Sequence, residues 1–182
     1  MDFIEKRDNI IEKAIMFATL AHEGDIRKSE PDKPKIIHPL AVAQILIEYG
    51  ADNNVIAAGI LHDVWEGTKY TLEDIKKVFG EDIAHLVYVA SKLELREKLV
   101  PLADKINNIE SLERLFKQKG CVDFSAFKRE KEKQEWYYRS IYESLIYNED
   151  KENPLFARLE RSINNVFGRT MEEYKEAMEN QR

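Results

Sequence analysis

Apolar residues recur at the three- and four-residue spacing of an α-helix along nearly the whole chain. Residues 3–22 place isoleucine and alanine side chains on one face, and Gly24 is expected to end that helix. Pro39 suits the first turn of a second helix, which would run to Gly50. The next segment, 53–66, is almost wholly apolar, which is typical of a helix at the buried centre of an all-α domain.

The second half of the chain continues the helical pattern with interruptions. The stretch 81–118 has helical periodicity, but Pro101 predicts a break or kink, because a proline inside a helix costs about 3 kcal/mol. Residues 119–127, which include Gly120, are expected to form a linker. Three further helices are expected, at about 128–147, 154–167 and 170–181.

A short helix is marked out by its own end signals. Thr71 and Asp74 have the spacing of a capping box, and Gly80 is expected to end the helix that they start. With the segments above, the pattern predicts an all-α fold, a bundle of about eight helices.

The composition narrows the class of protein. A length of 182 residues favours one domain over 1–182, with a core at about 3–147 and C-terminal helices at 154–181. The longest uncharged stretch, 36–47, is shorter than the roughly 18 residues of a transmembrane helix, and the charged N-terminus is unlike a signal peptide. A single cysteine, Cys121, suits a reducing compartment. We therefore expect a cytoplasmic protein with no membrane partner.

The net charge of −6 argues against binding to long nucleic acids, which is driven mainly by basic surfaces. The sequence leaves the oligomeric state open.

Two histidines stand in unusual surroundings. His38 opens the second predicted helix, and His62 is followed directly by Asp63 inside the most apolar helix of the chain. Burying a histidine beside an unpaired carboxylate costs several kcal/mol unless something compensates, and a metal ion would do so. The alternative is a capping or salt-bridge role for Asp63 and a hydrogen-bonded core role for His62.

A second group of polar residues among apolar neighbours favours a metal site over the alternative. Asp104 and Asn108 are four residues apart beside apolar neighbours, so they share one helix face. Two imidazoles and two carboxylates form a mixed nitrogen and oxygen site, which suits Mn²⁺, Fe²⁺ or Zn²⁺. Such a site activates water and polarises phosphoryl oxygens.

The order His38, then His62-Asp63, then Asp104 resembles the HD-domain metal-dependent phosphohydrolases. More narrowly, the chain is similar to the stand-alone RelA/SpoT-type hydrolases, which remove the 3′-pyrophosphate from (p)ppGpp. Residues 21–28, Thr68–Gly80 and 132–140 add to the resemblance, which covers about residues 10–147.

The resemblance implies an HD-domain helical bundle and an enzyme that hydrolyses a small nucleotide. It assigns the divalent metal, usually Mn²⁺, to His38, His62, Asp63 and Asp104, and it gives Glu66 the task of orienting or activating the attacking water. It also implies a set of substrate-binding residues: Arg27, Lys28, Asn108, Lys133 and Tyr137. Arg27–Lys35 and Lys128–Arg139, the two segments that it places around the nucleotide, both contain more basic than acidic residues.

Three features depart from the family pattern. Gly67, expected here to end the buried helix, replaces an aspartate that follows the glutamate; Pro101 replaces a lysine; and residues 92–100 are much shorter than the usual insertion. Two alternatives therefore stay open: an HD phosphohydrolase for another nucleotide or phosphate ester, or a catalytically weakened protein that binds metal and nucleotide.

Overall fold

The computed structural model describes residues 9–27, 30–92, 98–119, 124, 130–146 and 153–180. The chain divides into two compact units, Met1–Asn107 and Asn108–Arg182, so the unit boundary falls inside one helix. The prediction of a single domain over 1–182 stays a prediction. The elements of the first unit are α2 (Ile10–Ala21), β1 (Ile26–Arg27), β2 (Glu30–Pro34), α3 (Ile37–Tyr49), α4 (Asn53–Gly67), α5 (Leu72–Phe79) and α6 (Glu81–Lys92).

Helix α7 (Leu99–Lys119) spans the boundary, and the second unit continues with α8 (Lys131–Ile146), α9 (Pro154–Phe167) and α10 (Met171–Glu179). The all-α prediction is confirmed, with nine helices among the described residues. Within that part of the chain, no helix combines the length and the apolar character needed to cross a membrane.

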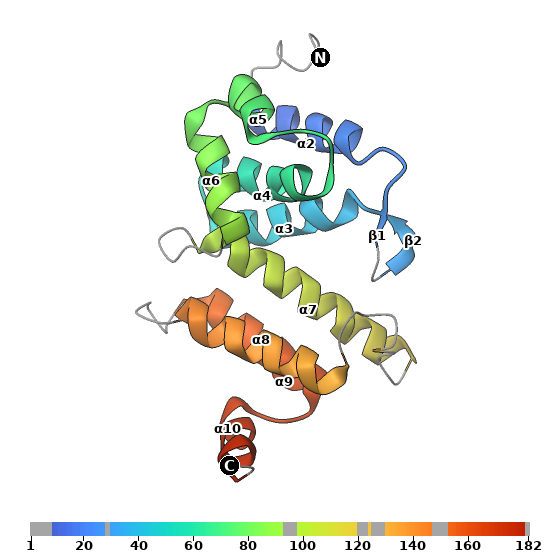
Figure 1. The fold of residues 1–182 in the computed structure, drawn as a ribbon, viewed down its shortest axis with the longest axis vertical. Helices are drawn as coiled ribbons and strands as arrows, with labels where there is room; N and C mark the ends of the chain where they lie inside the picture. The colour runs from blue at the N-terminus through green and yellow to red at the C-terminus, as the bar shows by residue number, and fades with distance from the viewer. Residues whose placement is uncertain are drawn as a thin grey trace. The chain divides into compact units, whose positions relative to one another are not determined.

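Helix α4 is the centre of the first unit, as its apolar sequence predicts. It packs against α2, α3 and α6, and it lies between α2 and α3 in Figure 1. The helix begins at Asp52, whose side chain accepts hydrogen bonds from the backbone amides of Asn54 and Val55. Eight of its residues are buried, from Ile56 through His62 together with Val64. A polar side chain on this helix is therefore held in an apolar, closely packed setting.

The predicted ends of α3 and α5 are confirmed, and the predicted end of α4 differs by one residue. Thr71 and Asp74 form a reciprocal capping box at the start of α5, and Gly80 follows the helix with a φ of 90°. Gly50 ends α3 in the left-handed conformation, and Pro39 lies in the first turn of α3. Gly67 is the last residue of α4 rather than its cap, which is Thr68.

Pro101 lies in the first turn of α7, where a missing amide hydrogen leaves no helical hydrogen bond unmade. Helix α6 ends at Lys92 and α7 begins at Leu99, so the predicted interruption of 81–118 precedes the proline. Most of the predicted linker, 119–127, lies outside the described residues.

A small antiparallel pair of strands was missed by the sequence analysis. Strand β1 pairs with β2 in a register that places Ile26 opposite Pro34 and Arg27 opposite Glu30. Local propensity gave no signal, because β2 contains two prolines, which strands tolerate only at edges and bulges. The chain then turns directly into α3, so this strand pair precedes the helix that carries His38.

Candidate metal centre

The start of α3 fixes the side chain of His38. The backbone amide of His38 donates to the carbonyl oxygen of Lys35 at 3.1 Å, and the imidazole is buried. Its Nδ1 lies 2.9 Å from the side-chain oxygen of Asn107 on α7, which can only accept. Nδ1 therefore carries a hydrogen, which leaves Nε2 as the ring atom that would bind a cation.

His62, in the middle of α4, is held in the same tautomer. Its Nδ1 donates to the carbonyl oxygen of Gly59 at 2.8 Å, within the same helix. Its Nε2 is buried and has no hydrogen-bond partner among the described residues. A buried nitrogen with a lone pair and no donor costs free energy unless it binds a cation. This orphaned atom favours a bound cation over a hydrogen-bonded core role for His62, whereas the ion pair of Asp63 with Lys35 agrees with the salt-bridge alternative.

Two carboxylates converge on these nitrogens. Oδ1 of Asp104 lies 3.0 Å from Nε2 of His38 and 3.7 Å from Nε2 of His62. Oδ1 of Asp63 lies 3.4 Å from Nε2 of His62. One ligand atom from each of His38, His62 and Asp104 lies within 4.8 Å of the others, and the two imidazole rings meet edge to face at 5.3 Å.

The carboxylate of each aspartate also forms an ion pair with a lysine. Nζ of Lys35 lies 2.5 Å from Oδ2 of Asp63, and Nζ of Lys105 lies 2.6 Å from Oδ2 of Asp104. Burial alone would raise the pKa of Asp104, but Lys105 and the two imidazoles lower it well below its ordinary value. Burial acts the same way on Asp63, and the imidazoles and Lys35 again lower its pKa. Both groups are therefore ionised at neutral pH.

The residues present fit a divalent cation. Two imidazole nitrogens and two ionised carboxylates form the mixed donor set that Mn²⁺, Fe²⁺ and Zn²⁺ accept. The hydrogen bonds from each Nδ1 orient the rings in the way usual for histidines that bind metals.

Glu66 lies one turn beyond His62 on α4, and its side chain is exposed. Desolvation raises the pKa of the Glu66 carboxyl, and the neighbouring carboxylates of Asp63 and Asp104 raise it further. The charge of His62 acts in the opposite direction, but the pKa stays above its ordinary value. A carboxylate with a raised pKa beside a cation site is suited to accept a proton from water.

Comparison with known proteins agrees with this geometry. The sequence pattern of the HD domain matches residues 14–111, more than half of the chain. The chain belongs to the HD-domain family. Membership of this family implies a divalent metal site, and the described residues supply the histidine and aspartate group for it.

The chain is also similar in sequence to several bacterial proteins. The chain is 34% identical over 122 residues to the guanosine-3′,5′-bis(diphosphate) 3′-pyrophosphohydrolase of Haemophilus influenzae, which covers 53% of this chain and 18% of the relative. It is 43% identical over 84 residues to the bifunctional (p)ppGpp synthase/hydrolase SpoT of Escherichia coli, covering 46% and 12%. The chain thus spans less than a fifth of the length of these curated relatives.

Solved structures show the same HD-domain fold. A metazoan ortholog of SpoT that hydrolyses ppGpp matches with a TM-score of 0.68 and 24% identity, covering 87% of this chain and 96% of that one. The protein lmo0812 of Listeria monocytogenes matches with a TM-score of 0.63 and 30% identity, covering 74% and 98%.

Of the substrate-binding residues expected in this HD domain, only Arg27 lies among the described residues of the first unit. Arg27 is buried in β1, with its guanidinium 3.1 Å from the carboxylate of Glu30, and Lys33 also pairs with Glu30. Lys28 lies outside the described residues. Asn108, Lys133 and Tyr137 belong to the second unit, and their roles stay predictions.

The sequence analysis missed two residues of the centre. Asn107 contacts His38, and its position three residues after Asp104 was the available signal. Lys35 was noted only as part of a basic segment, and nothing local indicated its contact with Asp63.

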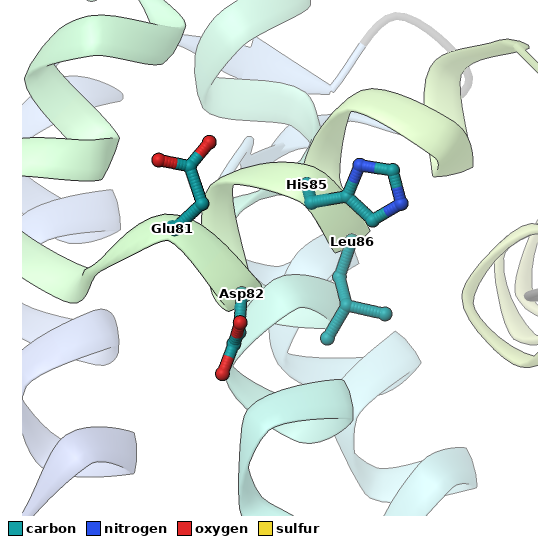
Figure 2. Close-up of a pocket in the computed structure, with 4 residues that line it drawn as sticks. All are labelled: Glu81, Asp82, His85 and Leu86. Carbon is teal, nitrogen blue, oxygen red and sulfur yellow. The ribbon is translucent and has the colours of Figure 1, made fainter.

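The other two histidines lie apart from the metal-ligand group. Buried His22 is the C-cap residue of α2, and its Nδ1 lies 3.2 Å from Oδ2 of Asp25. His85 is an exposed residue of α6 that lines a pocket with Glu81, Asp82 and Leu86, and Figure 2 shows these four side chains pointing in different directions.

Proposed function

We propose that this HD domain is a metal-dependent phosphohydrolase, and more narrowly that it releases pyrophosphate from the 3′ position of guanosine 3′,5′-bis(diphosphate). The observation that carries the broad proposal is the pair of buried Nε2 atoms of His38 and His62, which face the Asp104 carboxylate. The names of the relatives in Haemophilus influenzae and Escherichia coli support the narrow one.

The proposed metal ligands are His38, His62, Asp63 and Asp104, and the proposed ion is Mn²⁺. A bound divalent cation supplies Lewis acidity, which polarises phosphoryl oxygens and lowers the pKa of water. The donor set supports this assignment, because the Nδ1 hydrogen bonds leave each Nε2 to bind a cation and both carboxylates are ionised.

Glu66 is the proposed general base. It would take the proton from the attacking water as the water oxygen bonds to phosphorus. The bond from phosphorus to the 3′-oxygen breaks, and the 3′-oxygen takes up a proton from solvent to leave as a hydroxyl group. The position of Glu66 one turn after His62 and its raised pKa support the role.

The proposed substrate contacts are cationic, amide and aromatic side chains: Arg27, Lys28, Asn108, Lys133 and Tyr137. A small nucleotide with several phosphates needs cations of this kind, and the guanidinium of Arg27 suits bidentate binding of a phosphate. Because Arg27 is paired with Glu30, it would have to exchange that partner for the substrate.

A different nucleotide or phosphate ester is the second candidate substrate. Gly67 favours it, because the carboxylate that the family resemblance leads one to expect after Glu66 is missing, and the space beside Gly67 is open. Loss of one acidic group near the reacting water changes both the rate and the substrate that the site accepts.

The test is release of pyrophosphate from guanosine 3′,5′-bis(diphosphate) by the purified chain with Mn²⁺, compared with EDTA and with Asp104→Asn. We expect turnover with Mn²⁺ and none in either control. Metal binding without release from this substrate, but with hydrolysis of another nucleotide in a panel, would replace the narrow proposal with the second candidate. Metal binding with no hydrolysis in the panel would contradict both proposals.

A further inference from the structure

Lys35 is held at the edge of the metal centre by the backbone. It lies directly before α3, and its carbonyl oxygen accepts the hydrogen bond from the amide of His38 at 3.1 Å. The position of the Lys35 backbone is therefore tied to that of a metal-ligand residue, and only its side chain is free to rearrange.

The ammonium of Lys35 reaches a carboxylate that faces the centre. Nζ lies 2.5 Å from Oδ2 of Asp63, and that same oxygen lies 3.7 Å from Nε2 of His38. The Lys35 side chain is 29% exposed and the Asp63 side chain 15%, so the contact is screened less than a surface ion pair. Lys35 thus occupies an oxygen to which a cation at the centre would also be drawn.

The charges around the centre are balanced by lysines. The carboxylates of Asp63 and Asp104 each pair with one ammonium, from Lys35 and Lys105 respectively. A divalent cation entering this group adds positive charge beside two existing ammonium groups. An anion that binds with the cation restores the balance, and a phosphoryl group is such an anion.

We propose that Lys35 opposes binding of the metal alone and couples metal binding to phosphate binding. With metal and phosphate both present, its ammonium leaves Asp63 and binds a phosphoryl oxygen. Because coupling between two ligands is reciprocal, the metal also strengthens phosphate binding by the same factor. This inference rests on the proposed metal-dependent function and deepens it by naming a residue that positions the phosphate.

The test measures Mn²⁺ affinity rather than turnover. Free Mn²⁺ is followed by its electron paramagnetic resonance signal during titration of the full chain, with and without inorganic phosphate. In the parent chain, we expect phosphate to tighten Mn²⁺ binding about tenfold, within the usual range of coupling between sites. In Lys35→Met, we expect binding about tenfold tighter without phosphate and almost no further gain when phosphate is added.

Two variants serve as controls. Lys77→Met removes the same charge from an exposed position on α5 and should leave both affinities as in the parent. Lys35→Arg keeps the charge and should preserve the gain from phosphate.

Equal Mn²⁺ affinities in the parent and Lys35→Met, or an undiminished gain from phosphate in that variant, would overturn the role of Lys35 while leaving the proposed function standing. Absence of Mn²⁺ binding in the parent itself would instead remove the proposed function.

Discussion

The orientation of each imidazole in the proposed metal centre depends on one hydrogen-bond acceptor. For His38 that acceptor is the side chain of Asn107, and for His62 it is the backbone of Gly59. A side-chain acceptor can be removed by substitution, whereas a backbone carbonyl cannot. Asn107 is therefore the residue through which the orientation of His38 can be tested.

We predict that Asn107→Ala lowers Mn²⁺ affinity by about 10–100-fold, the range usual for losing a group that orients a metal-binding histidine. Calorimetric titration measures the change. Asn107→Asp keeps an oxygen that accepts from Nδ1 and should retain affinity near that of the parent. An alanine variant that binds Mn²⁺ as tightly as the parent would show that His38 is oriented without Asn107.

Glu66→Gln is expected to reduce the turnover number by about 10²–10⁴, the contribution of a general base, with Mn²⁺ affinity nearly unchanged. Desolvation of the carboxyl and the neighbouring Asp63 carboxylate raise the pKa of Glu66 above that of an ordinary carboxyl. Protonation of Glu66 removes the base, so the activity of the parent should fall on the acid side of the pH–rate profile. The glutamine variant should lack this acid limb in a pH–rate profile. If the variant kept the same loss of activity at low pH, that loss would come from the titration of a group other than Glu66.

At the scale of elements, the crossing of α3 and α4 positions both histidines. Gly59 is the point of close approach, since a Cβ atom there would lie 2.5 Å from Cδ1 of Leu46, which is fully buried. The same residue supplies the carbonyl oxygen that accepts from His62. The packing of the two helices and the orientation of the imidazole therefore share one residue.

Gly59→Ala should lower the free energy of unfolding by about 1–3 kcal/mol, the usual effect of adding a methyl group to a packed core. Urea unfolding measures it. Gly67→Ala, near the end of the same helix, meets open space and should instead be neutral or stabilise by up to about 1 kcal/mol. If both variants destabilised equally, the cause would be the helix backbone rather than the contact with Leu46.

At the scale of the whole molecule, the HD-domain match and the division into units nearly coincide. The match ends at residue 111 and the first unit at Asn107, so every proposed metal ligand belongs to the first unit. The second unit has its own buried polar cluster. Arg139, which is 1% exposed, donates to Glu135 at 2.9 Å, and Arg169 donates to the same carboxylate at 2.6 Å.

Glu135→Gln should destabilise the second unit by about 3–5 kcal/mol, because it leaves the buried Arg139 without its counter-charge. Glu143→Gln breaks only an exposed pair with Lys175 and should cost less than about 1 kcal/mol in the same unfolding experiment. Similar losses in the two variants would contradict the special role of the buried cluster.

The same carboxylate predicts a dependence on pH. Burial would raise the pKa of Glu135, but its hydrogen bonds to Arg169 and Arg139 outweigh this and lower it. A carboxyl whose pKa is lowered by folding contributes stability above its unfolded pKa and loses that contribution as the pH falls through the folded value. The parent should therefore lose stability on acidification below the ordinary carboxyl pKa, and Glu135→Gln should lose less. Parallel curves of stability against pH would contradict this prediction.

The sequence by itself determined the helices, several of their ends and the residue types of the metal centre. Helical periodicity and caps such as Thr71 with Asp74 depend on residues three or four positions apart, so the local sequence contains the whole signal. The family pattern added the association of His38, His62, Asp63 and Asp104.

Only the tertiary structure decided which atoms meet. His38 and Asn107 are 69 positions apart in sequence, and the ion pair of Lys35 with Asp63 joins the turn before α3 to α4, so no local pattern encodes either contact. The pairing of Arg27 with Glu30 likewise depends on a strand pair that the helical pattern did not reveal. Residue types follow from local sequence, whereas tautomers, partners and charge balance depend on how the chain packs on itself.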